Sequence, residues 1–126
     1  MIALGIAVAT VVSFIASAAL YSLPPVAALV TRTSTPRPGV SVPLQMASVL
    51  LRSLLASCLI AGLMAAADWH GPFIGGLLGL ALVIIPLILL LGGVVHENTA
   101  PSAAGIHLVD WIVKLTLIGV IVGLFI

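Results

Sequence analysis

Three ionisable residues near the end of the chain are spaced as one stripe of a helix. His107, Asp110 and Lys114 follow one another at i, i+3 and i+7 within an apolar run. At about 100° per residue, they fall within about 60° of one another around the helix axis. An acid between two bases on one helix face has the chemistry to form a buried ion pair, to hold a charged ligand or to pass a proton.

A second stripe repeats this spacing earlier in the chain. Gln45, Ser48 and Arg52 also lie at i, i+3 and i+7 in an apolar segment. An arginine inside a bilayer costs at least about 2.5 kcal/mol when it stands alone. Arg52 is therefore expected to find an acidic partner on another helix.

The arginine and the aspartate are predicted to lie at one depth in the membrane. Arg52 follows Pro43 by nine residues, and Asp110 follows Pro101 by nine. Both prolines stand where a helix can begin, so each charge lies about 13 Å along its helix. We therefore predict an Arg52–Asp110 ion pair inside a helical bundle, with Lys114 sharing the carboxylate from one turn further along.

Hydroxyl side chains form a third stripe near the N-terminus. Thr10, Ser13, Ser17 and Tyr21 occupy one face, and the last two reach the level of the charged residues. His107 lies nearest the interface and is expected to donate to a backbone carbonyl. Two interpretations of the cluster stay open. It is either polar glue that fixes helix register or a site that handles a ligand or an ion.

The composition requires lipid as the solvent of the helices that position these residues. Apolar residues make up 63% of the chain and charged residues 6%, whereas a soluble domain averages about 25% charged residues. Short connections make sequential helices antiparallel neighbours. The predicted fold is an all-α, four-transmembrane-helix antiparallel bundle in a single membrane domain. The spans, each sufficient for a core about 30 Å thick, are expected at residues 1–22, 43–67, 72–95 and 102–126.

Charges in the connections predict the orientation. Arg32 and Arg37 lie in the loop at residues 31–42, and the other two connections have no Lys or Arg. The positive-inside rule places that loop in the cytoplasm and both termini outside the plasma (inner) membrane.

Small residues and one proline predict how the spans pack. Two GxxxG pairs favour close approach of helices, within the chain or between subunits. They are Gly75 with Gly79 and Gly119 with Gly123. Pro86 should kink the third span and free the carbonyl of Leu82 for a donor from the charged cluster.

No motif predicts catalysis. The chain has no GxSxG, HExxH, P-loop or CxxC, and Cys58 is its one cysteine. His107 and Asp110 lack a third metal ligand, and Lys114 would repel a cation. We expect no enzyme activity, no cofactor and no metal, and a net charge of +1 gives no reason to expect nucleic acid.

Two short motifs resemble the DUF1761 family. Leu-Tyr-Ser-Leu-Pro at residues 20–24 ends the first predicted span, and Gly-Ile-His-Leu-Val-Asp-Trp at residues 105–111 leads into Lys114 and Gly119. The family usually shows Trp-Tyr-Ser-Pro at the first place. The resemblance covers nearly the whole chain and implies a small bacterial four-helix membrane protein of unknown function.

Two functional hypotheses follow. The first is a non-enzymatic accessory or structural subunit that packs through its transmembrane helices against other membrane proteins or copies of itself, because lipid-facing apolar surface dominates the chain. The alternative is a small oligomeric transporter or proton-coupled carrier that uses Arg52, Asp110 and Lys114.

Overall fold

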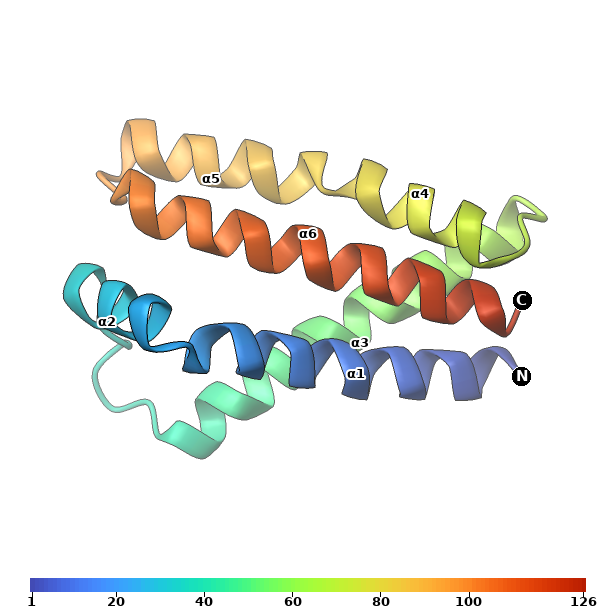
Figure 1. Cartoon of the computed structure of the whole chain (residues 1–126), viewed down its shortest axis with the longest axis horizontal. Helices are drawn as coiled ribbons and strands as arrows, with labels where there is room; N and C mark the ends of the chain where they lie inside the picture. Colours follow the sequence, from blue (N-terminus) through green and yellow to red (C-terminus); the bar gives the residue numbers. More distant parts are fainter.

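Six helices make up the protein, and the computed structural model describes all residues from 1 to 126. The helices are α1 (Ile2–Ser22), α2 (Pro24–Thr33), α3 (Val42–Ala66), α4 (Pro72–Leu82), α5 (Ile84–His96) and α6 (Pro101–Leu124). Four segments are long and apolar enough to cross a membrane: α1, α3, α4 with α5, and α6. The predicted fold class is confirmed, and the chain is a multi-pass membrane protein with both termini at one end of the bundle (Figure 1).

The helix starts follow from proline and serine. A proline stands at the first or second position of α2, α3, α4 and α6, where its missing N–H costs no hydrogen bond. Ser41 precedes α3, and its hydroxyl accepts from the backbone N–H of Leu44 at 3.4 Å. The spans therefore begin and end within two residues of the predicted positions.

Helix α6 lies at the centre of the molecule. It packs against α1, α3, α4 and α5, and it also touches α2. The fully buried apolar core lies where α3 meets it, and its members include Ile60, Met64, Ile118 and Val122.

Glycines allow α4 and α6 to pack backbone against backbone. A Cβ on Gly75 would overlap the carbonyl oxygen of Gly119, and a Cβ on Gly79 would overlap that of Leu115. Gly123 lies in the same way against the backbone that begins α4. The two GxxxG pairs thus face each other inside one chain, which leaves them unavailable as a contact between subunits.

The third span is interrupted near its middle, as Pro86 predicts. α4 ends at Leu82 and α5 begins at Ile84, and Pro86 has no N–H to donate to the carbonyl four residues before it. No side chain donates to the Leu82 carbonyl in its place. Pro86 is the one buried residue of α5, so this half of the span lies at the edge of the bundle.

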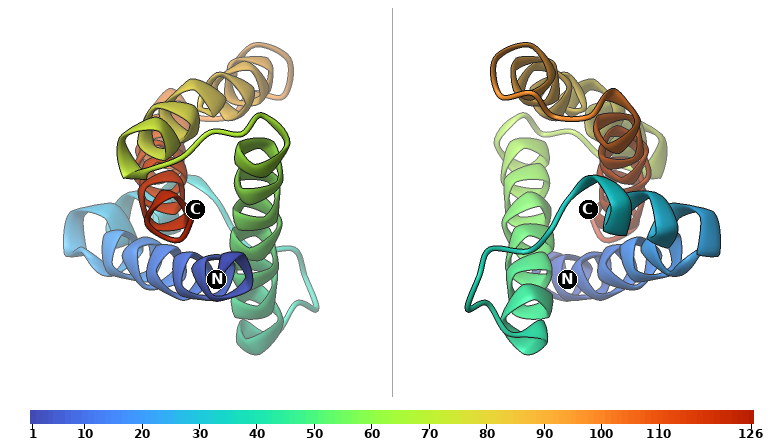
Figure 2. Two further views of the ribbon diagram at one scale, coloured as in Figure 1. Left: turned by 90° about the vertical axis from the view of Figure 1, so that its right-hand side faces the viewer. Right: turned by 90° about the vertical axis from the view of Figure 1, so that its left-hand side faces the viewer.

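Helix α2 was not predicted. It lies across the end of the bundle, roughly perpendicular to the spans (Figure 2). Val26, Leu29 and Val30 are half-buried whereas Arg32 is exposed, which is the pattern of a helix at an interface. Pro24 ends α1 and also begins a new helix, so the loop extends over residues 34–41 in place of the predicted 31–42.

Helix α3 crosses α1 and α6 obliquely (Figures 1 and 2). It meets α4 near the turn at Asp68 that joins them, and it makes no contact with α5. The bundle is therefore closed at the end that carries the termini and opens between α3 and α5 toward the other end.

Candidate functional site

The carboxylate of Asp110 is the centre of a buried polar cluster. The hydroxyl of Ser17, on α1, donates to its Oδ1 at 2.5 Å. The ammonium of Lys114 lies 3.6 Å from its Oδ2. Asp110 is 8% exposed and Lys114 is 1% exposed, so both charges lie inside the bundle. The arrangement joins α1 to α6 through a charged hydrogen bond, which is about twice as strong as a neutral one.

The lysine has two kinds of partner. Its Nζ lies 5.1 Å from the centre of the Trp111 ring, within the range of a cation–π contact. The 3.6 Å separation from Asp110 exceeds the length of a direct hydrogen bond, so the pair interacts mainly by charge. Two opposite charges so close together neutralise each other, which is what makes their burial tolerable.

One turn nearer the α2 end, Tyr21 and His107 form a second link between α1 and α6. The phenol oxygen lies 2.6 Å from Nδ1 of the imidazole, and both side chains are half-buried. The expectation that His107 donates to a backbone carbonyl is wrong, because its hydrogen-bond partner is the tyrosine hydroxyl.

A seam of hydroxyls continues toward the other end of the bundle. Thr10 Oγ1 donates to the Ile6 carbonyl at 2.7 Å and lies 3.3 Å from Oγ of Ser57. Ser57 in turn donates to the Ser53 carbonyl at 2.8 Å, and Ser13 donates to the Thr10 carbonyl at 3.1 Å. Oγ of Ser53 is fully buried and has no partner. These small side chains let α1 and α3 approach closely, as small polar residues do in membrane proteins.

The predicted Arg52–Asp110 ion pair is absent. Arg52 is exposed, and the chain forms no salt bridge to it. The buried face of α3 carries Ser53 and Ser57, and a step of one residue turns a side chain by about 100°. The carboxylate of Asp110, which was predicted to pair with Arg52, instead interacts with Ser17 and Lys114.

The other members of the predicted α3 stripe also lie outside the buried cluster. Ser48 is exposed, and the amide of Gln45 donates to the Val40 carbonyl at 3.4 Å. With Arg37 and Arg52 they line a cavity of about 640 Å³ between α3 and the loop that precedes it. We call this cavity the polar hollow.

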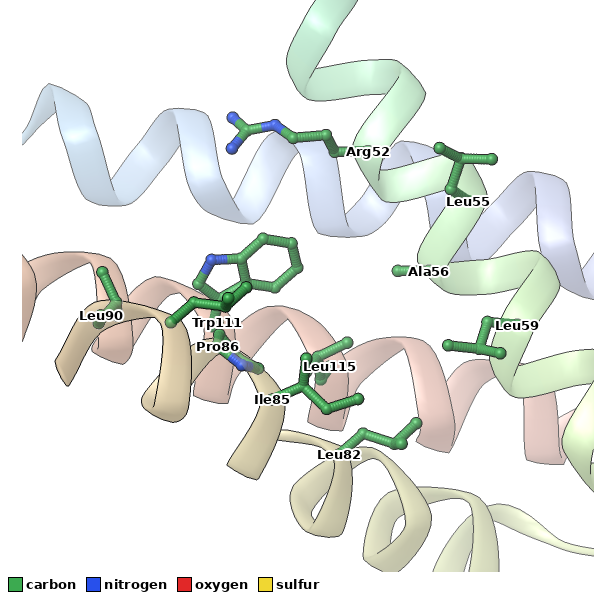
Figure 3. A pocket seen from close by; sticks show the side chains of 11 residues that line it. Arg52, Leu55, Ala56, Leu59, Leu82, Ile85, Pro86, Leu90, Trp111 and Leu115 are labelled. Atoms are coloured by element: carbon green, nitrogen blue, oxygen red, sulfur yellow. The ribbon is translucent and has the colours of Figure 1, made fainter. Parts of the chain in front are cut away.

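Arg52 also lines a second cavity, the lateral groove, which opens between α3 and α5. Its volume is about 400 Å³. The floor is formed by Trp111 and Leu115 of α6 (Figure 3). The walls are apolar and consist of Leu55, Ala56, Leu59, Leu82, Ile85, Pro86, Leu89 and Leu90. Neither cavity is lined by Asp110 or Lys114, so the buried ion pair is sealed from both.

A further polar contact lies at the opposite end, outside the spans. Nε2 of His70 lies 2.9 Å from Asp68 Oδ1, and its Nδ1 lies 3.0 Å from the backbone oxygen of Ile126. The hydrogen bond with Asp68, followed by that with Ile126, raises the pKa of His70 above its ordinary value. When His70 is protonated, it donates to both oxygens and so links the α3–α4 turn to the end of α6.

The sequence singled out the α6 stripe and the α1 stripe, and the structure brings these two together. The sequence analysis did not identify Ser53 and Ser57 as members of the cluster. Their i, i+4 spacing, which is typical of small polar residues at a helix contact, was the available signal. Arg52 was predicted to turn into the bundle because of its charge. A long side chain can, however, reach water or a headgroup from a lipid-facing position.

A family model described as "Protein of unknown function (DUF1761)" matches residues 4–123. The chain belongs to the DUF1761 family. The resemblance noted for residues 20–24 and 105–111 is thereby confirmed. No curated protein and no solved structure matches this DUF1761 protein. The roles of its residues consequently rest on the geometry described above.

Proposed function

We propose that this DUF1761 protein is a non-enzymatic subunit that assembles within the bilayer, against another membrane protein or a second copy of itself. The observation that supports this role most is the sealed Asp110–Lys114 pair. Its charges neutralise each other in the packed interior, where neither the polar hollow nor the lateral groove reaches them. Asp110 fixes the register of α1 on α6 through its hydrogen bond with Ser17, and Lys114 balances its charge, which leaves the outside of the bundle for lateral contacts.

The outer face of α5 supports the same proposal. Ile84, Ile88, Leu91 and Val95 lie on one face and are all more than half exposed. α5 is also the half-span that the bundle buries least. A partner helix packed there would cover the apolar face that the bundle leaves exposed.

The orientation proposed from the loop charges fits the same arrangement. Arg32 lies in the last turn of α2 and Arg37 in the loop that follows it, at the end of the bundle opposite the termini (Figure 1). The positive-inside rule puts this end in the cytoplasm of a bacterial cell, with the protein in the plasma membrane and the termini outside.

Photocrosslinking in the native membrane tests the proposal. A photoreactive amino acid at Ile88, on the outer face of α5, is expected to give one discrete crosslinked product, a heteromer or a dimer. The matched control carries it at Val11, a position of α1 that is also more than half exposed. Equal, diffuse labelling at both positions, with only monomer after mild solubilisation, would contradict the proposal.

A second candidate is a proton-coupled carrier, and one observation favours it. Lys114, Asp110, His107 and Tyr21 form a file of ionisable groups from the middle of α6 toward its start. Asp110→Asn in proteoliposomes distinguishes the two functions. A carrier loses proton-driven flux and stays folded, whereas a structural pair loses stability.

A further inference from the structure

The lateral groove and the polar hollow adjoin each other at Arg52, which lines both. The apolar groove lies between α3 and α5, and the polar hollow lies at the end of the bundle that carries α2. We call the two together the amphipathic cavity. In Figure 3 the guanidinium of Arg52 extends away from Leu59 and toward the side on which Leu90 lies. A charged end joined to an apolar channel is the shape of a lipid site.

Two cations of this cavity have no partner within the protein. Neither Arg37 nor Arg52 forms a salt bridge or donates a hydrogen bond. No acidic residue lines the hollow or the groove. The remaining polar groups of the hollow include the hydroxyls of Thr31, Thr35 and Ser48, which can donate to an oxyanion. The cavity is therefore complementary to an anion, and arginine binds phosphate through paired N–H groups.

The apolar part suits a flexible hydrocarbon chain. The groove has a volume of about 400 Å³, and every residue that lines it except Arg52 is apolar, so it can hold an acyl chain. The groove opens sideways because α3 makes no contact with α5, so a lipid can enter directly from the bilayer.

We propose that this cavity binds an anionic glycerophospholipid, with its phosphate between Arg37 and Arg52 and one acyl chain along the lateral groove. Trp111, whose ring has an apolar body and a polar N–H, lines the groove together with Arg52. Basic pockets between helices at the cytoplasmic side of a membrane are general sites for anionic headgroups. The site is separate from the sealed ion pair and from the outer face of α5.

Native mass spectrometry of the delipidated full chain tests this site. Phosphatidylglycerol is titrated against phosphatidylcholine with the same acyl chains. Phosphatidylglycerol should bind about tenfold or more tightly, and Arg52→Gln should remove most of that preference. The matched control is Arg32→Gln, which removes an equal charge at the same end of the bundle but lies outside the cavity. It should keep the preference.

Two further arms identify the source and the position of the ligand. Ala56→Phe fills the groove without changing charge, and it should weaken binding of phosphatidylglycerol. A phosphatidylglycerol with a photoreactive acyl chain should label α3 and α5 of the unaltered protein. Equal binding of the two lipids, equal effects of the Arg52 and Arg32 substitutions, or labelling elsewhere would overturn the site. Displacement of the lipid by millimolar inorganic phosphate would overturn the commitment to a phospholipid.

Discussion

The glycine contact between α4 and α6 gives the prediction whose size follows most directly from the coordinates. In Gly75→Ala, the new methyl group would overlap the carbonyl oxygen of Gly119. Because the obstacle is backbone, the two helices must separate by about an ångström, and gaps of that size forfeit a quarter to a half of each van der Waals contact. Overpacking of this kind costs about 1–3 kcal/mol. It outweighs the gain of about 0.5–1 kcal/mol that alanine brings to a helix interior.

The same membrane span provides a matched control. Gly92 has open space within 4 Å of the position a Cβ would take. Gly92→Ala should therefore leave stability unchanged or raise it by up to about 1 kcal/mol, since only helix propensity acts. Unfolding in mixed micelles under rising SDS measures both variants. Equal midpoints for the two substitutions would refute the inference that the GxxxG pairs pack within one chain.

Two further predictions concern the histidines. Tyr21→Phe removes the hydroxyl beside His107 and should lower the free energy of unfolding by about 0.5–1.5 kcal/mol; an unchanged imidazole Nδ1 resonance in nitrogen NMR would contradict that contact. Because the pKa of His70 is raised in the folded protein, its contribution to stability is fully present below its ordinary pKa and is lost as pH rises through the raised value. Asp68→Asn should bring the pKa measured by NMR titration back toward its ordinary value, and no change would show that the carboxylate is not its cause.

Hydropathy predicts the four spans well because lipid demands about 20 apolar residues of each one. It says little about which face of a span turns inward, because in a membrane the lipid-facing side is as apolar as the core. On α3 the inward face is marked by Ser53 and Ser57. Arg52, one residue away, has the stronger chemical signal and points elsewhere. The charge of Arg52 thus did not mark the buried face of α3, whereas the i, i+4 spacing of Ser53 and Ser57 did.

The part of the site that lies on a single helix could be predicted from the sequence. Asp110 and Lys114 lie one turn apart on α6, so their proximity follows from the helix itself. The α1 stripe was also placed correctly, since Ser17 reaches the carboxylate. The oblique path of α3 and the lateral groove could not be predicted, because crossing angles depend on which side chains interlock between helices distant in sequence.

Helix α2 was not predicted from the sequence for a different reason. Two adjacent prolines, Pro24 and Pro25, were interpreted as the end of a span, yet proline is equally suited to the first turn of a new helix. Its ten residues are too few to cross a bilayer, so span-length arguments do not detect it.

The proposed role of this protein depends most on the Asp110–Lys114 pair being sealed and structural. A double-mutant cycle tests it through the free energies of unfolding of the original protein, Asp110→Asn, Lys114→Met and the double variant. Each single change leaves a buried group uncompensated and should cost about 3–5 kcal/mol, while the double variant should lie within about 1 kcal/mol of the original or be more stable. Single costs that simply add, with a coupling below about 0.5 kcal/mol, would contradict the claim.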